Sequence, residues 1–273
     1  MTVLVTGSRG AVARGLMALL HTAAIPYRAA SAKPSDSGTV RLDLTDPSTF
    51  PAALAAVRSV FLYAGAEHID AFISDAVAAG VEHVVLLSSS SVRSPDADAS
   101  AIAKTHLDVE NALTASPLPS TLLRPGAFAS NAGAWAWAIT SGRPVSLPYP
   151  DAHSDPIHER DIAEAAFAVL TDTTLSGRAY TLTGPQSLTF AEQLATLSGV
   201  IGRDIPTRHV TRDEWKAEVG GHMPPAYADA LLDYWQSNDT KPVPLTDSVH
   251  DLTGHAPRDF ATWATDHKAR FST

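Results

Sequence analysis

The chain has 273 residues, of which 45% are hydrophobic and 18% charged, and its 20 Lys+Arg against 29 Asp+Glu give a formal net charge of -9. A chain of this length can bury a core without metals or disulfides, and the absence of cysteine excludes disulfides, thiolate zinc sites and a cysteine nucleophile. The acidic balance and the lack of basic runs argue against nucleic-acid binding and against docking on an anionic membrane.

The first residues are typical of a strand and lack the charged start of a signal peptide. The most apolar later stretch, residues 81–87, contains Glu82 and His83 and is far shorter than the roughly 20 residues of a membrane span. We therefore expect a cytoplasmic protein without a membrane segment.

Short apolar runs alternate with longer amphipathic segments through the first half of the chain, which is the pattern of parallel strands joined by crossover helices. The expected fold is α/β, with a doubly wound parallel sheet. Strands are predicted at residues 3–6, 27–31, 40–43, 57–63, 84–87 and 121–123, and helices at 12–22, 48–56, 69–79, 102–115 and 131–140.

Proline and histidine become frequent after about residue 145. We therefore predict two domains, a nucleotide-binding domain over 1–145 and a smaller, mostly helical substrate-binding lobe over 146–273, some strands of which return to the sheet. Aromatic residues gather in this lobe, where they either line an apolar pocket or pack in the core.

A glycine loop between the first predicted strand and helix has the setting of a dinucleotide-binding loop. Gly7 suits a tight turn, Gly10 lets the backbone approach a pyrophosphate, and Ala13 is small enough for close helix packing. The alternative is a plain glycine turn. The cofactor-binding residues predicted here are Gly7, Ser8, Arg9, Gly10, Ala11 and Val12.

The end of the second predicted strand distinguishes NADP from NAD, because a carboxylate there binds the ribose 2′-hydroxyl whereas a cation accommodates a 2′-phosphate. Ser31 and Lys33 stand at this end without an acid, and Arg9 is within reach from the glycine loop. The sequence favours NADP(H) over NAD(H), unless Lys33 is only a solvated turn residue.

The carboxyl ends of parallel strands meet at one crevice, where such sheets bind their ligands. The residues that follow the other predicted strands are therefore further candidates for cofactor binding. They are Asp43, Leu44, Tyr63, Ala64, Gly65, Ser88 and Ser89, although serine-rich strand ends also serve only to bridge backbone groups.

Several motifs together resemble the NmrA-like group of atypical short-chain dehydrogenase/reductases. They are the runs 3–16, 31–34, 41–47, 84–89, 121–128 with Asn131, 156–163 and 180–185, which span most of the chain. The resemblance implies an NAD(P)-binding Rossmann fold, and it leaves the reaction open, since the group contains quinone and ether reductases, isomerases and cofactor-sensing regulators.

Ordinary short-chain dehydrogenases carry a Tyr-x-x-x-Lys pair, with a glutamate four residues after the lysine. Aligning Glu110 with that glutamate places His106 at the lysine position and Ile102 at the tyrosine position. The usual proton donor is therefore missing. His106 is a candidate for binding the nicotinamide ribose or for catalysis, with a structural histidine as the alternative, and Lys104 is expected to face solvent.

Another group must then protonate the product, and the candidates are Tyr149, His153 and His158. Asp161 fits a helix capping box and is expected to be structural. The scattered histidines lack the helical pairing typical of zinc, so we predict no metal site.

The sequence thus predicts an NADP(H)-dependent oxidoreductase that reduces a small aromatic, quinone-like or carbonyl-containing molecule. The alternatives are an NADP(H)-sensing regulator without catalysis and a redox-neutral isomerase or cyclase. A small-molecule substrate is the expected partner, and an oligomer is possible.

Overall fold

A computed structural model describes residues 2–34, 36–65 and 67–272. It divides the chain into two compact units, each assembled from separate stretches. The first comprises residues 1–125, 159–182 and 248–255, and the second comprises 126–158, 183–247 and 256–273. The predicted boundary at residue 145 falls within the second unit, because the chain leaves and re-enters the first.

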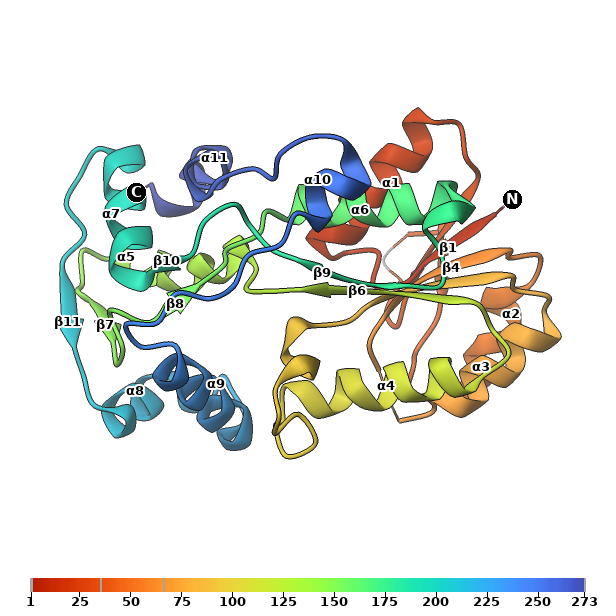
Figure 1. The fold of residues 1–273 in the computed structure, drawn as a ribbon, viewed down its shortest axis with the longest axis horizontal. Helices are drawn as coiled ribbons and strands as arrows, with labels where there is room; N and C mark the ends of the chain where they lie inside the picture. The colour runs from red at the N-terminus through yellow and green to blue at the C-terminus, as the bar shows by residue number, and fades with distance from the viewer. Residues whose placement is uncertain (1, 35, 66, 273) are drawn as a thin grey trace. The chain divides into compact units, whose positions relative to one another are not determined.

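A seven-stranded sheet forms the middle of the first unit, in the order β3-β2-β1-β4-β5-β6-β9 (Figure 1). All of its strand pairs are parallel. The order reverses direction between β1 and β4, which is the switch point at which such sheets bind ligands. The strands are β1 (Val3–Val5), β2 (Tyr27–Ser31), β3 (Thr39–Arg41), β4 (Ser59–Tyr63), β5 (His83–Leu87), β6 (Ser120–Pro125) and β9 (Ala179–Leu182).

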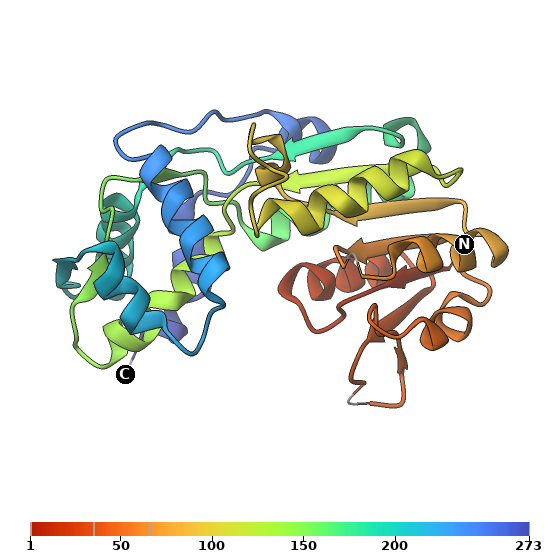
Figure 2. The ribbon, with the colours of Figure 1, turned by 90° about the horizontal axis from the view of Figure 1, so that it is seen from below.

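Helices cover both faces of this sheet. One face carries α1 (Ala11–Thr22), α6 (Glu159–Thr171) and α10 (Ser248–Thr253), and the other carries α2 (Phe50–Leu54), α3 (Ile69–Ala78) and α4 (Ala103–Ala115) (Figures 1 and 2). The doubly wound fold is therefore confirmed. The short 3₁₀ helices of this unit are η1 (Pro47–Thr49), η2 (Ser90–Arg93) and η4 (Thr173–Leu175).

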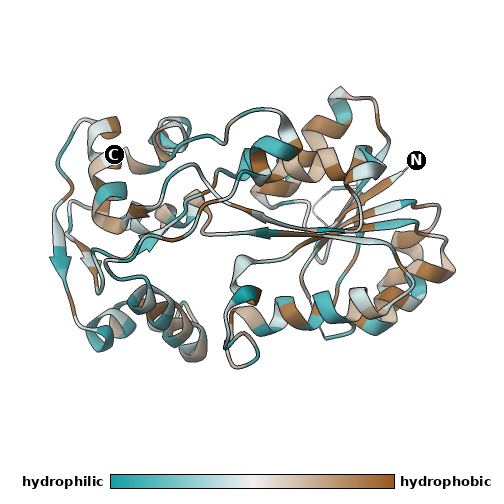
Figure 3. Ribbon diagram, viewed as in Figure 1, coloured by the Kyte–Doolittle hydropathy of each residue, from teal (hydrophilic) through white to brown (hydrophobic). Residues whose placement is uncertain are grey.

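The central strands β1, β4 and β5 are buried at almost every position, because helices cover both faces of the sheet. Leu4, Leu62 and Leu86 belong to one fully buried cluster with residues of α2, α3 and α4, while β1 is hydrophobic along its whole length (Figure 3). On the other face, a Cβ at Gly15 of α1 would stand 2.9 Å from the Cβ of Ala163 in α6. The small residues at this crossing allow the two helices to approach closely.

The second unit contains helices and two small sheets, in which β7 pairs with β11 and β8 pairs with β10. Its core includes Trp263, Phe260 and Phe271, each almost fully buried. Its elements are η3 (Ala129–Trp135), α5 (Ala136–Thr140), β7 (Val145–Leu147), β8 (His153–Ser154), β10 (Leu188–Thr189), α7 (Phe190–Ile201), β11 (Thr207–His209), α8 (Arg212–Val219), α9 (Pro225–Ser237), α11 (Phe260–Asp266) and η5 (Lys268–Phe271).

Two predicted elements differ from the structure. The expected helix at 131–140 is a 3₁₀ helix followed by a single α-helical turn, and the helix expected at 48–56 is likewise divided into η1 and α2. Pro51 has no N–H to donate a hydrogen bond back to Pro47, which accounts for the division between η1 and α2. Within the described ranges, none of the helices has the length and apolarity to cross a membrane.

Candidate functional site

The glycine loop of the first unit joins β1 to α1 at the switch point of the sheet. Gly7 has φ +58°, in the left-handed region that favours glycine, and its carbonyl accepts the Gly10 N–H at 2.8 Å. Helix α1 follows at once, with neither a side-chain cap nor an acidic residue in its first turn. The positive end of its dipole is thus left for an anionic ligand.

Tyr63, at the carboxyl end of β4, fills the space beneath this loop. A Cβ at Gly7 would stand 2.8 Å from the tyrosine ring, and one at Gly10 would stand 2.6 Å from its hydroxyl oxygen. Burial raises the pKa of Tyr63, and a hydrogen bond from the Ala13 N–H partly offsets this rise. A side chain at Gly10 would therefore also collide with the hydroxyl of Tyr63, in addition to the predicted role of Gly10 in admitting a pyrophosphate.

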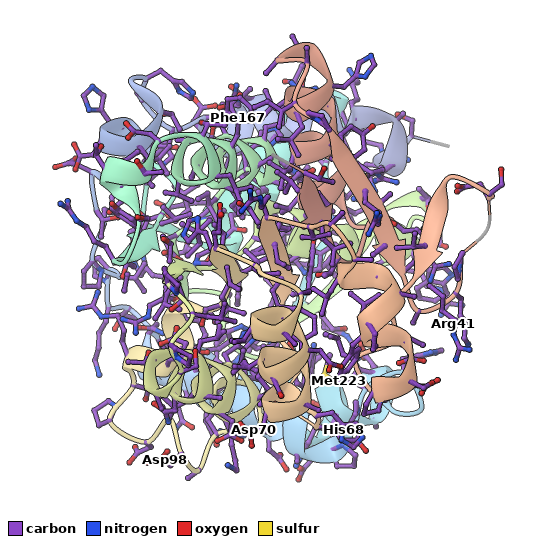
Figure 4. All side chains as sticks on the ribbon, turned by 90° about the vertical axis from the view of Figure 1, so that its right-hand side faces the viewer. Arg41, His68, Asp70, Asp98, Phe167 and Met223 are labelled. Carbon is purple, nitrogen blue, oxygen red and sulfur yellow. The ribbon has the colours of Figure 1, made fainter. Side chains whose placement is uncertain are left out.

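The edge of the sheet carries positive charge beside the ends of β2 and β3. Ser31 is buried and its hydroxyl accepts the Lys33 N–H at 3.3 Å, whereas Lys33 and Arg9 are exposed. On β3, Arg41 reaches the rim of this unit (Figure 4) and pairs with Asp46 at 3.1 Å. The residues that follow β2, from Ala32 to Pro34, include a cation and no acid.

Asp43 and Leu44 lie immediately beyond β3. The carboxylate of Asp43 accepts the hydroxyl of Thr45 at 2.8 Å and its N–H at 3.1 Å. These bonds, with smaller contributions from Arg41 and Lys33, hold the pKa of Asp43 below its ordinary value. The tip of the Leu44 side chain would stand 2.7 Å from a Cβ at Gly65, so Leu44 packs directly over this glycine.

Two buried residues and the half-buried Arg124, from separate elements, form a network at the carboxyl ends of β5 and β6. Ser88 donates its hydroxyl to Glu110 of α4 at 2.5 Å. Arg124 of β6 binds both oxygens of the same carboxylate, through Nε at 2.9 Å and Nη2 at 2.5 Å. The hydroxyl of Ser89 instead accepts the Ser91 N–H at 3.2 Å and begins η2. Sequence reasoning used Glu110 only to align the helix and missed Arg124.

His106 lies one turn before Glu110 on α4. Its Nδ1 atom is buried and has no hydrogen-bond partner among the residues that the structure describes. Burial lowers the pKa of His106, with a smaller opposing effect from Glu110, so its imidazole is neutral at neutral pH. Lys104 is exposed and pairs with Asp108 at 2.9 Å, as the helical register predicts.

The predicted proton donors all lie in the second unit. His153 of β8 is half-buried, and its Nδ1 is 3.2 Å from the hydroxyl of Ser187. His158 is 1% exposed, with Nε2 3.4 Å from the Asp266 carboxylate. Tyr149 is half-buried and hydrogen-bonded to Arg212.

Asp155 is a buried carboxyl of this unit that sequence reasoning missed. It is 5% exposed and accepts the Ala127 N–H at 3.0 Å, and a Cβ at Gly126 would stand 1.9 Å from its Oδ2. Burial raises the pKa of Asp155 from 3.8 to about 6. Burial and the charge of Asp155 also raise the pKa of Tyr234. No local pattern around Asp155 signals these contacts, because Gly126 lies far away in sequence.

Most aromatic residues of the second unit pack on one another. Phe190 makes edge contacts with Trp135 and Trp235, and Trp235 makes another with Trp215. This favours core packing for these rings, whereas Trp137 is 65% exposed.

One group of potential metal ligands occurs among the described residues. Atoms of Asp161, Glu164 and His255 lie within 4.8 Å of one another. His255 Nε2 is 2.8 Å from the Glu164 carboxylate, which is the geometry of an ordinary hydrogen-bonded pair.

Residues 7–173, from the glycine loop to the start of η4, match the model of an NAD(P)H-binding family. The chain belongs to this NAD(P)H-binding family. The resemblance to NmrA-like dehydrogenase/reductases is thereby confirmed, and so is the expectation, at the level of the family, of an NAD(P)H-dependent reductase.

Two relatives are similar to this chain along almost their whole length. A (4-alkanoyl-5-oxo-2,5-dihydrofuran-3-yl)methyl phosphate reductase of Streptomyces griseus is 34% identical over 99% of both chains. An NAD(P)H azoreductase of Xenophilus azovorans is 31% identical over 98% of this chain and 99% of its own.

Solved structures share the fold. Triphenylmethane reductase of Citrobacter sp. in complex with NADP(H) superposes with a TM-score of 0.78 at 20% identity, covering 98% of this chain and 99% of that one. An NADPH-dependent quinone oxidoreductase of Escherichia coli gives 0.80 at 22% identity, covering 97% and 99%.

Proposed function

We propose that the protein is an NADP(H)-dependent oxidoreductase that reduces a small aromatic, quinone-like or carbonyl-containing molecule in the cytoplasm. The observation that carries this proposal is the glycine loop at the switch point, where Gly7 turns the chain into an uncapped helix N-terminus. Such a terminus favours a pyrophosphate. The reductase names of two relatives over the whole chain support the reaction class.

The cofactor fits the residues at the carboxyl ends of the strands. The buried Nδ1 of His106 has no hydrogen-bond partner among the described residues, which favours a proton on Nε2 that the ring can donate to a ligand. We assign the pyrophosphate to Gly7, Ser8, Arg9, Gly10, Ala11 and Val12, the adenosine half to Ser31, Lys33, Asp43 and Leu44, and the nicotinamide half to Tyr63, Ala64, Gly65, Ser88, Ser89 and His106.

The preference for NADP(H) follows from charge. Lys33 and Arg9 are exposed cations beside the end of β2, and Ser31 supplies no negative charge there. A 2′-phosphate gains two charge-assisted contacts from such an arrangement. Asp43 is less suited to bind the ribose hydroxyl of NAD, because Thr45 already occupies one of its oxygens.

The bound cofactor supplies the hydride. In the chain itself, a neutral His106 donates a hydrogen bond without bringing a positive charge, unlike the lysine it replaces. We retain Tyr149, His153 and His158 as candidates for delivering the proton. Of the two histidines, His153 is better suited to deliver a proton to a substrate, because it is less buried than His158.

A non-catalytic NADP(H) sensor is the second candidate. Ile102 and His106 stand where ordinary short-chain dehydrogenases place tyrosine and lysine, and this observation favours binding without turnover. A redox-neutral isomerase or cyclase shares the same prediction of no net NADPH consumption.

Turnover separates these candidates. The purified protein is incubated with NADPH and a panel of quinones, aromatic ketones and azo compounds, and the loss of nicotinamide absorbance is followed. Steady NADPH consumption that depends on one of these compounds supports the reductase. NADPH binding without consumption across the panel favours the sensor or the redox-neutral enzyme. His153→Ala is then compared with His209→Ala, an exposed histidine of the same unit, to test the proton donor.

A further inference from the structure

Ser88, Glu110 and Arg124 form a hydrogen-bonded network that joins α4 to the ends of β5 and β6. The Glu110 side chain is 4% exposed and accepts three hydrogen bonds, two of them from the Arg124 guanidinium. A bidentate guanidinium fixes a carboxylate in position and in plane. Glu110 thereby ties α4 to the carboxyl ends of β5 and β6 at one point.

The direction of its hydrogen bond decides whether the Ser88 hydroxyl can still donate to a ligand. Ser88 has a single hydroxyl proton, and it goes inward to Glu110. Ser88 is also 3% exposed. Its side chain therefore has no proton left to donate to the cofactor, and the assignment of Ser88 to the nicotinamide half rests on its backbone. Its side chain serves instead to anchor the end of β5, directly before the half-buried Ser89.

His106 shares a helix face with Glu110, because side chains four residues apart on a helix lie one above the other. Its buried Nδ1 has no partner in the described chain. An unprotonated nitrogen is cheaper to bury without a partner than an N–H group. This favours the tautomer that carries its proton on Nε2, so the ring has one donor to offer a ligand.

Resting on the proposed function, we propose that Glu110 is the positioning residue for the nicotinamide half of the cofactor. Clamped by Arg124, it anchors the end of β5 through Ser88 and sets the register of α4, so that His106 donates Nε2–H to a ribose hydroxyl. Glu110 itself does not touch the cofactor. The adenosine half, held by residues near Lys33 and Asp43, is independent of this network.

The test compares two ligands by calorimetry. NADPH has both halves, whereas adenosine 2′,5′-bisphosphate has only the adenosine half with its 2′-phosphate. Ser88 and Nε of Arg124 donate to the same oxygen of Glu110, and Nη2 of Arg124 donates to the other. In Glu110→Gln the carbonyl oxygen can keep the first two bonds, but the amide NH₂ then faces Nη2 of Arg124, donor against donor, and the bidentate clamp is lost. We expect this variant to bind NADPH at least about ten-fold more weakly, the equivalent of one lost hydrogen bond to a ligand, and to bind adenosine 2′,5′-bisphosphate as the wild type does.

Two further variants keep the test decisive. Ser88→Ala removes only the anchor of β5 and leaves the Glu110–Arg124 pair intact, so it decides the outcome if Glu110→Gln does not fold. Asp108→Asn changes the exposed side of the same helix, where Asp108 pairs with Lys104, and is expected to leave both affinities unchanged. Thermal unfolding of each variant shows whether it is folded.

Selective loss of NADPH affinity in Glu110→Gln and Ser88→Ala supports the inference. Wild-type affinity for NADPH in both folded variants overturns it, and so does an equal loss of both ligands, which indicates a general structural role. Failure of the proposed function has a different signature: the wild type itself then binds neither ligand, and the inference falls with it.

Discussion

Replacing the buried Asp155 with asparagine tests how this carboxyl is held in the second unit. Burial raises the pKa of Asp155 from 3.8 to about 6, so the folded chain retains a proton that the unfolded chain loses. Below about pH 4 both states are protonated, and the group costs nothing. Between pH 4 and pH 6 the unfolded chain loses the proton before the folded chain does, so the free energy of unfolding falls. Above pH 6 the loss levels off at about 3 kcal/mol, the value of a pKa shift of roughly two units.

Asparagine has the shape of the protonated acid and does not titrate. Its Oδ1 can still accept the Ala127 N–H, which Asp155 accepts at 3.0 Å. We therefore expect Asp155→Asn to gain up to about 3 kcal/mol of unfolding free energy relative to the wild type between pH 4 and pH 8. Urea denaturation at both pH values measures this difference, and any constant effect of the amide cancels.

Asp172→Asn is the control with the opposite sign. Asp172 is exposed, and its hydrogen bonds from the Thr174 hydroxyl and N–H hold its pKa below the ordinary value. Its contribution to stability is present above pH 4 and is lost as the pH falls. A stability difference between wild type and Asp155→Asn that stays constant from pH 4 to pH 8 would refute the reasoning about Asp155.

The other predictions concern stability and cofactor choice. Gly126→Ala places a Cβ 1.9 Å from an Asp155 oxygen and is expected to lower the unfolding free energy by about 1–3 kcal/mol in urea denaturation. Gly199→Ala, in an open helical position of α7, should instead raise it by about 0.5–1 kcal/mol. Equal effects of the two substitutions would contradict the packing argument. Tyr63→Phe removes the acceptor of the Ala13 N–H and should lower the unfolding free energy by about 0.5–1.5 kcal/mol, so an unchanged denaturation midpoint would exclude that bond. Lys33→Glu should weaken NADPH binding by at least about ten-fold relative to NADH, and an unchanged ratio of the two affinities would remove Lys33 from the 2′-phosphate site.

The order of elements and the register of α4 were predictable from local sequence. Periodic apolar residues indicated the strands and helices of the sheet, and the spacing from Glu110 correctly placed Lys104 on the exposed side. The glycine loop was predictable because its turn and its helix are adjacent in the chain. In each case the determining contacts lie within a few residues of one another.

Contacts between distant residues could not be predicted in this way. The hydroxyl of Tyr63 at Gly10, Arg124 on Glu110 and Asp155 beside Gly126 each join separate elements, and one sequence does not record such pairings. The strand β9 was expected only as some strand returning to the sheet, because residues 179–182 pair with β6 across a long separation.

The central claim is that the loop beginning at Gly7 binds the pyrophosphate of NADP(H), and a fluorescence titration of the wild-type protein tests it most directly. We predict saturable binding of NADPH, tighter than that of NADH, with enhanced nicotinamide emission. Failure of both nucleotides to bind would contradict the claim.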